Sequence, residues 1–138
     1  MTIQFNQYFL DLDLLINKLN YQTFDCIIAL KRSGFILGAV LSNHLDIPLF
    51  VPSEIESIPK QFQRCLVVDD KICTGKSIKK ITNRLLKLNK SVTTAVLYVE
   101  GSIKSDIWIV ETGQSCTMWY EKQKRNYKNY PIDNQLLT

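Results

Sequence analysis

The strongest constraint on the fold is an alternation of short apolar runs with amphipathic stretches along the chain. The apolar runs are typical of strands, several of them buried on both faces, and they comprise residues 24–30, 49–51, 65–68, 92–99, 107–110 and 116–119. The amphipathic stretches, with apolar side chains at helical spacing, are residues 5–19, 35–45 and 76–88. This order predicts a three-layer α/β fold, with helices on both faces of a mostly parallel sheet.

Length and composition favour one soluble domain over residues 1–138. The hydrophobic share of 46% and the charged share of 22% exclude a disordered chain. The sequence has no apolar stretch of membrane-spanning length and no secretory leader, so we expect a cytoplasmic protein with no membrane contact. The four cysteines form no C-x-x-C pair, which argues against a disulfide or zinc framework. A net charge of +4 suits a phosphorylated ligand and does not argue for nucleic acid.

The polar segment after the strand at 65–68 carries the chemistry. Asp69 and Asp70 precede a Thr-Gly-Lys-Ser turn that opens the helix at 76–88. A helix N-terminus offers free amide groups to a phosphate, and Gly75 lets the backbone approach closely. A Walker A loop is excluded, because Asp70 occupies the place of its first glycine. The two acids can bind sugar hydroxyls or Mg²⁺-bound water, or they can be solvated loop residues.

This segment resembles the signature with which type I phosphoribosyltransferases bind 5-phosphoribosyl 1-diphosphate (PRPP). Residues 25–99 follow the family's order of elements. The resemblance implies a Mg²⁺-dependent glycosyltransferase of nucleotide salvage that transfers 5-phosphoribosyl to a nucleobase and releases pyrophosphate. Relatives of this kind commonly form homodimers.

The resemblance also implies a role for each matching residue. Asp69 and Asp70 would hold the ribose hydroxyls and, through water, Mg²⁺, and Arg32 would stabilise the leaving pyrophosphate. These residues form the catalytic set. The 5-phosphate would lie against Cys73, Thr74, Gly75, Lys76 and Ser77. The pyrophosphate would lie against a loop formed by Lys31, Arg32, Ser33 and Gly34, which could otherwise be an exposed capping turn.

A small C-terminal hood, from about 107–130, would select the base. Trp119 and Glu121 are similar to the tryptophan-and-acid segment in the hood of bacterial xanthine-guanine phosphoribosyltransferases, which favours a purine. A ring can stack on a base and a carboxylate can accept its N–H. Core packing is the alternative role for Trp119.

Three departures from the family pattern keep other functions open. Cys73 stands where 6-oxopurine enzymes usually carry an aspartate, Lys71 replaces an apolar residue, and only residues 52–63 remain for the usual mobile lid. A non-catalytic PRPP- or nucleotide-binding regulator of the same fold is therefore an alternative. A third reading is an RNA-binding protein that uses the basic helix and the basic tail at 122–128.

Overall fold

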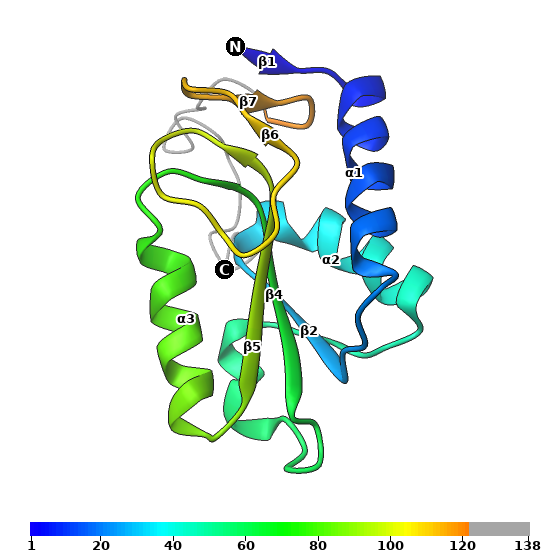
Figure 1. Ribbon diagram of the computed structural model, residues 1–138, viewed down its shortest axis with the longest axis vertical. Coiled ribbons are helices and arrows are strands. Elements are labelled where there is room, and N and C mark those ends of the chain that lie inside the picture. Colours follow the sequence, from blue (N-terminus) through cyan, green and yellow to red (C-terminus); the bar gives the residue numbers. More distant parts are fainter. Residues whose placement is uncertain (122–138) are drawn as a thin grey trace, which may run out of the picture.

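The computed structural model describes residues 1–121, except the side chain of Lys31, and confirms the alternation of strands and helices (Figure 1). The strands are β1 (Thr2–Ile3), β2 (Cys26–Ala29), β3 (Leu49–Phe50), β4 (Arg64–Ile72), β5 (Ser91–Val99), β6 (Val110–Glu111) and β7 (Thr117–Met118). The helices are α1 (Phe5–Leu19), α2 (Lys31–Leu45), the 3-10 helix η1 (Pro52–Ser57) and α3 (Lys76–Lys87).

The main sheet has the order β3-β2-β4-β5-β6, and every neighbouring pair in it is parallel. All four residues of β2 are buried, as the apolar run predicts for a strand covered on both faces. Because the strands are parallel, their carboxyl ends lie at one edge of the sheet. The segments that follow β2, β4 and β5 therefore meet at that edge.

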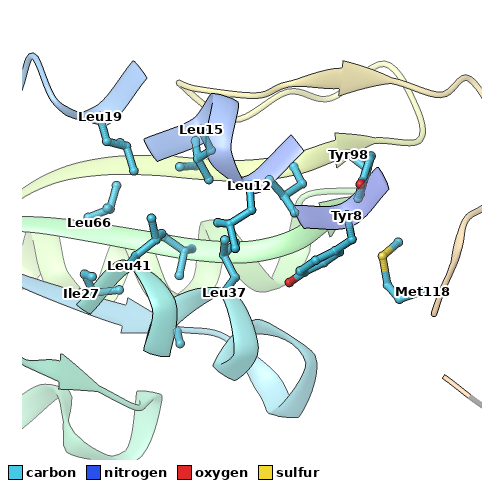
Figure 2. Packing of buried hydrophobic residues seen from close by; sticks show 14 of the residues in the cluster. Tyr8, Leu12, Leu15, Leu19, Ile27, Leu37, Leu41, Leu66, Tyr98 and Met118 are labelled. Carbon is cyan, nitrogen blue, oxygen red and sulfur yellow. The ribbon is translucent and has the colours of Figure 1, made fainter. Parts of the chain in front are cut away.

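Two apolar clusters cover the two faces of this sheet and make the fold three-layered. One cluster joins α1 and α2 to one face, and it includes Leu12, Leu37 and Leu66 (Figure 2). The other joins α3 and η1 to the opposite face, and it includes Ile55, Val67 and Ile81. Figure 1 shows α3 and α1 on opposite sides of the sheet. The predicted three-layer α/β fold is confirmed.

Two local predictions were wrong. The polar segment that begins at Lys31 is not a loop, because α2 starts at Lys31 and its first turn is closed by a bond from Gly34 N to Leu30 O of 3.0 Å. The strand predicted at 65–68 does not end before the acids, because β4 continues to Ile72 and contains Asp69 and Asp70. Pairing with β5 holds these polar residues in the strand, as in the register of Asp69 with Val96.

A second, smaller sheet joins the two ends of the described chain. In it β1 pairs in parallel with β7, so Thr2 lies opposite Thr117 and Ile3 opposite Met118. The segment expected to form the hood therefore pairs with an N-terminal strand that the sequence pattern did not predict. The part of the expected hood at 122–130, and the basic tail at 122–128, lie outside the described residues.

Candidate functional site

A pocket of about 200 Å³ lies at the carboxyl edge of the sheet. It is lined by residues of four segments, which follow or end β2, β4 and β5 and begin α3. The lining consists of Ser33, Asp69, Lys71, Ile72, Cys73, Thr74, Gly75, Lys76, Ser77, Ile78 and Glu100. The structure thus brings Asp69, Ser33 and the whole expected phosphate segment together in one hollow.

Gly75 shapes the phosphate segment at the start of α3. It caps the helix in the left-handed region, with φ 77°, which a residue with a side chain rarely adopts. The first bond back into the helix runs from Lys79 N to Gly75 O, at 2.9 Å. Within residues 1–121, the amides of Gly75, Ser77 and Ile78 donate no hydrogen bond. They are the free first-turn donors that an anion can accept.

The segment after β5 packs against this turn. A side-chain carbon at Gly101 would lie 3.2 Å from Cys73 O, so glycine permits the close contact of the two backbones. Ile103 extends over Gly75, since an added carbon there would lie 2.9 Å from Ile103 Cγ2. The Cys73 side chain itself is exposed. The sequence pattern did not indicate that residues 100–103 would form one side of the phosphate segment.

The two acids at the end of β4 have different surroundings. Asp69 lines the pocket, is 8% exposed, and its Oδ1 accepts the amide of Asp70 at 2.8 Å. Asp70 is 1% exposed and does not line the pocket. Its Oδ1 accepts the hydroxyl of Tyr8 at 3.0 Å, whereas its Oδ2 is buried with no hydrogen-bond partner. The two acids therefore differ in their hydrogen-bond partners and in their exposure to the pocket.

Burial raises the pKa of Asp70 to about 7, because a carboxylate loses its hydration in the apolar surroundings. The hydrogen bond from Tyr8 opposes this shift, and the nearby Asp69 adds to it. The same contacts raise the pKa of Tyr8, with burial again the largest cause. The helical spacing of residues 5–19 puts Tyr8 on the apolar side of the stretch, but nothing in the pattern indicated its partner 62 residues away.

The expected pyrophosphate segment is only partly in the pocket. Ser33 lines it, and Gly34 lets the first turn of α2 approach β4, since an added carbon would lie 3.4 Å from Asp69 Oδ1. The Arg32 side chain is exposed and does not line the pocket. Lys31 is placed by its backbone alone, at the start of α2. The glycine therefore serves close packing as well as any contact with an anion.

The Lys71 side chain is partly exposed, but its ammonium group already has partners within the protein. Its ammonium group donates to Cys116 O at 2.5 Å and lies 3.8 Å from Glu100 Oε2. The amide of Cys116 donates to the same Glu100 oxygen. This Lys71–Glu100–Cys116 link ties the carboxyl ends of β4 and β5 to the segment that leads into the hood. The sequence pattern marked Lys71 as unusual but did not indicate these partners.

The two expected base-binding residues lie in the hood and outside the pocket. Trp119 packs in an aromatic cluster, with its ring centroid 5.0 Å from that of Phe5 and 5.2 Å from that of Tyr120. Its Nε1 and the Tyr120 hydroxyl are buried without a hydrogen-bond partner. Glu121 is exposed. Packing in this cluster thus explains the position of the Trp119 ring, while the ring N–H has no hydrogen-bond partner in residues 1–121.

The segment where the family usually carries a lid belongs to the core. Ile55 of η1 is fully buried and Ile58 nearly so, both against α3. Arg84 of α3 pairs with Glu56 of η1 at 2.8 Å. Within residues 1–121, no helix is both long and apolar enough to cross a membrane, and no group of three or more metal-ligating side chains is present.

Comparison with solved structures identifies the fold. The chain is similar to a purine phosphoribosyltransferase from Pyrococcus horikoshii Ot3, with a TM-score of 0.77 and 24% identity over 91% of this chain and 95% of that one. It is similar to a xanthine-guanine-hypoxanthine phosphoribosyltransferase from Helicobacter pylori, with a TM-score of 0.77 and 18% identity over 87% and 92%. A hypothetical protein from Neisseria gonorrhoeae with bound ppGpp gives a TM-score of 0.73 and 18% identity over 89% and 90%.

No protein-family model matches the sequence, and no curated protein matches it either. The structural likeness therefore carries the assignment, and at these identities it establishes the fold. The chain has the fold of the type I phosphoribosyltransferases, as the segment from Leu66 to Ser77 predicted.

Proposed function

We propose that the protein is a nucleobase phosphoribosyltransferase that transfers 5-phosphoribosyl from PRPP to a base, with a purine favoured. The observation that carries the proposal is the pocket of about 200 Å³, which combines Asp69 with the free first-turn amides of α3. A phosphorylated sugar needs this pair of features, donors for its phosphate and acceptors for its hydroxyls. The resemblance of the fold to purine phosphoribosyltransferases supports the same choice of substrate.

In this proposal the 5-phosphate lies at the N-terminus of α3. The amides of Gly75 and Ser77 donate to it, and the hydroxyls of Thr74 and Ser77 add donors from the same segment. The positive end of the α3 dipole favours the anion further. Cys73 and Lys76 complete the cradle, the first through its backbone and the second through its charge.

The ribose and the leaving group would lie between the ends of β2 and β4. Asp69, and Asp70 through Oδ2, accept the ribose hydroxyls. The first turn of α2, with Ser33 and Gly34, receives the pyrophosphate, and the cations of Lys31 and Arg32 stabilise it as its charge develops. The bond from the anomeric carbon to the pyrophosphate oxygen breaks, the bond to a base nitrogen forms, and the base loses a proton.

The residues present fit a magnesium ion that arrives bound to the substrate. Asp70 Oδ2 is buried with no partner in residues 1–121, and the neighbouring Asp69 lines the pocket, so the two carboxylates suit Mg²⁺-bound water. Within residues 1–121 no cluster of three ligating side chains could hold the ion alone. Diphosphate oxygens and water would supply the remaining ligands. When bound, the ion would neutralise charge on the leaving pyrophosphate.

The base would lie under the hood, near Trp119 and Glu121. The unpartnered Nε1 of Trp119 can donate to an exocyclic oxygen of the base, and the exposed Glu121 can accept a ring N–H. Both groups suit a 6-oxopurine. Cys73 replaces the aspartate expected for such a base. The proton that the base loses would therefore pass to another group or to water.

A second candidate is a regulator that binds PRPP or a phosphorylated nucleotide without transfer. The observation that favours it is the packing of residues 52–63 into the core, which leaves no mobile lid before β4 to exclude water from a reacting site. The similarity to a protein determined with bound ppGpp supports the same candidate.

One set of measurements separates the candidates. The protein is incubated with Mg²⁺, PRPP and hypoxanthine, guanine, xanthine, adenine, uracil or orotate in turn, and nucleotide and pyrophosphate are quantified. Binding of PRPP and of ppGpp is measured by calorimetry. We expect nucleotide with a 6-oxopurine, and a loss of about a hundredfold or more in Asp69→Asn. Asp13→Asn, which neutralises an exposed acid on α1, is the matched control and should keep full activity.

Each outcome assigns a function. Saturable binding of PRPP or ppGpp without nucleotide, lost in Asp69→Asn or Ser77→Ala, supports the regulator. Absence of both binding and turnover refutes the phosphoribosyl site. In that case binding of single-stranded RNA with a steep salt dependence would point to the basic surface instead.

A further inference from the structure

Tyr8 is a buried residue of α1 whose hydroxyl reaches the second acid of the candidate site. Its side chain has no exposed surface, and its OH donates to Asp70 Oδ1 at 3.0 Å. Figure 2 shows Tyr8 in the apolar cluster beside Met118 of β7 and below Tyr98 of β5. A helix with no residue in the pocket lining therefore contacts an acid at the carboxyl edge of the sheet.

A second buried tyrosine in the same cluster provides a comparison. Tyr98 OH donates to Asp11 Oδ2 at 2.6 Å, and Gln7 Nε2 donates to Asp11 Oδ1 at 2.9 Å. Both oxygens of Asp11 thus have donors within the protein, as expected of a structural carboxylate. Asp70, by contrast, has a donor on one oxygen only, and its buried Oδ2 has none.

The unpartnered oxygen of Asp70 lowers the stability of the folded protein when no ligand is bound. A buried carboxyl oxygen without a partner carries its desolvation penalty in full. The hydroxyl of Tyr8 fixes the other oxygen, so the carboxyl group cannot rotate to exchange the two without breaking that bond. Such an arrangement holds one acceptor in a set direction for a donor that residues 1–121 do not supply.

The ring of Tyr8 makes a second set of contacts, with the hood. Its centroid lies 6.0 Å from that of Trp119 and 6.1 Å from that of Tyr120, both in edge-to-face geometry. These are favourable arrangements for aromatic pairs. The hydroxyl of Tyr8 therefore contacts the acid assigned to the ribose, and its ring contacts Trp119, which is assigned to the base, and the neighbouring Tyr120.

We propose that Tyr8 is a positioning residue of the substrate site, and this rests on the proposed function. Its hydroxyl orients Asp70 so that Oδ2 accepts a ribose hydroxyl of PRPP. Its ring supports Trp119 and Tyr120 on the side of the base. The two contributions are separable, because phenylalanine keeps the ring and removes only the hydroxyl.

The test compares Tyr8→Phe with Tyr98→Phe. Each variant deletes one buried hydroxyl that donates to a buried carboxylate in the same cluster, so Tyr98→Phe measures the structural cost of such a loss away from the pocket. For each, KM is measured for PRPP and for the base, together with kcat, the dissociation constant of ribose 5-phosphate and the unfolding midpoint in urea. Tyr8→Leu, which also removes the ring, is measured in the same way.

We expect Tyr8→Phe to raise KM for PRPP and the dissociation constant of ribose 5-phosphate about tenfold or more, as for the loss of a contact to a charged group. KM for the base should stay at the wild-type value in Tyr8→Phe and rise in Tyr8→Leu. Tyr98→Phe should shift the unfolding midpoint by a similar amount and leave both KM values unchanged. A purely structural role of Tyr8 cannot produce this split.

The failure of this proposal is distinguishable from that of the proposed function. If the wild-type protein binds ribose 5-phosphate and forms nucleotide, but Tyr8→Phe behaves as Tyr98→Phe does, the positioning role is wrong and the enzyme assignment stands. If the wild-type protein binds PRPP without turnover, the dissociation constants of ribose 5-phosphate in wild type, Tyr8→Phe and Tyr98→Phe are sufficient to test the role of the Tyr8 hydroxyl. If wild type binds neither compound, both proposals are overturned.

Discussion

The two ends of the central sheet differ in how completely their polar groups are paired. At the amino end, Asp25 Oδ2 accepts the amides of Gln63 and Arg64, both at 2.8 Å, and Lys90 Nζ donates to Pro59 O at 3.0 Å. At the carboxyl end and in the hood, Asp70 Oδ2, Trp119 Nε1 and Tyr120 OH are buried without partners. Within residues 1–121, the hydroxyl of Thr82 in α3 is the one other buried side-chain group without a partner, and it lies outside this region.

This difference distinguishes polar groups that stabilise the fold from polar groups that could bind a ligand. The polar groups of the amino end bond to one another and to the backbone, so that end needs no ligand. Within residues 1–121, the carboxyl end and the hood keep unpaired buried acceptors and donors, although most buried polar groups in proteins are paired. A ligand that supplies the missing partners is the simplest physical reason for such an arrangement. Substitutions at the amino end of the sheet can therefore serve as controls for substitutions at the carboxyl end.

The largest expected effect tests the unpaired acid at the carboxyl end through pH. The pKa of Asp70 is raised to about 7, above its unfolded value of about 3.9. The folded state therefore holds a proton that the unfolded state has lost, and the unfolding free energy falls as pH rises from about 4 to about 7. Between pH 5 and pH 8 we expect a loss of about 3 kcal/mol in wild type, absent in Asp70→Asn.

Urea unfolding at pH 5 and pH 8 checks this prediction. Asp13→Asn, at an exposed position of α1, should keep the wild-type dependence. Asp25 provides the contrast at the amino end, because the backbone bonds from Arg64 and Gln63 lower its pKa. Its contribution is present above its unfolded pKa and is lost only in acid, below about pH 4. An Asp70→Asn protein with the same pH dependence as wild type would show that Asp70 is not the group responsible.

The next effect concerns the backbone of the phosphate segment. Gly75→Ala places a carbon 2.9 Å from Ile103 Cγ2 at a residue with φ 77°. The left-handed conformation costs an L-residue about 1–2 kcal/mol, and the clash displaces the turn. We expect PRPP affinity to fall roughly tenfold or more, because amides that face the phosphate move.

Gly113→Ala is the matched control for this substitution. Gly113 has φ 65°, with nothing within 4 Å of the added carbon, and it does not line the pocket. Both variants should lose a similar amount of unfolding free energy from backbone strain, while Gly75→Ala alone loses PRPP binding. Calorimetric titration with PRPP and urea unfolding measure the two quantities. Equal PRPP affinities in the two variants would place the phosphate elsewhere.

A smaller effect is expected at the amino end. Asp25→Ala removes the acceptor of two backbone amides near the surface, so we expect a loss of about 1 kcal/mol in unfolding free energy. PRPP binding should stay at the wild-type value, since the change lies at the opposite end of the sheet. A tenfold weaker PRPP affinity at unchanged stability would break the division between the two ends.

The elements that the sequence predicted are those set by local pattern. The buried run of β2, the amphipathic spacing of α1 and the glycine turn before α3 each depend on neighbours within a few residues. The expected phosphate segment therefore gathers around one pocket, as its spacing indicated. Its assigned role in binding stays a prediction.

The features that the sequence did not predict depend on distant partners. The extension of β4 through Asp69 and Lys71 comes from pairing with β5, which overrides the low strand propensity of charged residues. The first turn of α2, which starts earlier than predicted, packs closely against β4 at Gly34. The contact of Tyr8 with Asp70 spans 62 residues. Spacing in a single sequence carries no record of such contacts.

The smallest effect tests the paired part of the carboxyl end. The ammonium of Lys71 donates to Cys116 O and lies 3.8 Å from Glu100, so Lys71→Met should loosen the link between β5 and the hood. A partly exposed ion pair contributes about 1 kcal/mol or less to stability. Global unfolding should therefore change little, while amide exchange across residues 112–121 should become faster because the segment is released locally.

Lys76→Met is the control for this prediction, because it removes an exposed cation that lines the same pocket and forms no hydrogen bond or ion pair with residues 107–121. In Lys76→Met, amide exchange in residues 112–121 should remain at the wild-type rate. If Lys71→Met also leaves that exchange unchanged, the hood is held by its own packing around Met118 and Trp119, and the charges at the carboxyl end have no structural task. In that case Lys71 and Glu100 would join the groups at this end whose purpose is to meet a ligand.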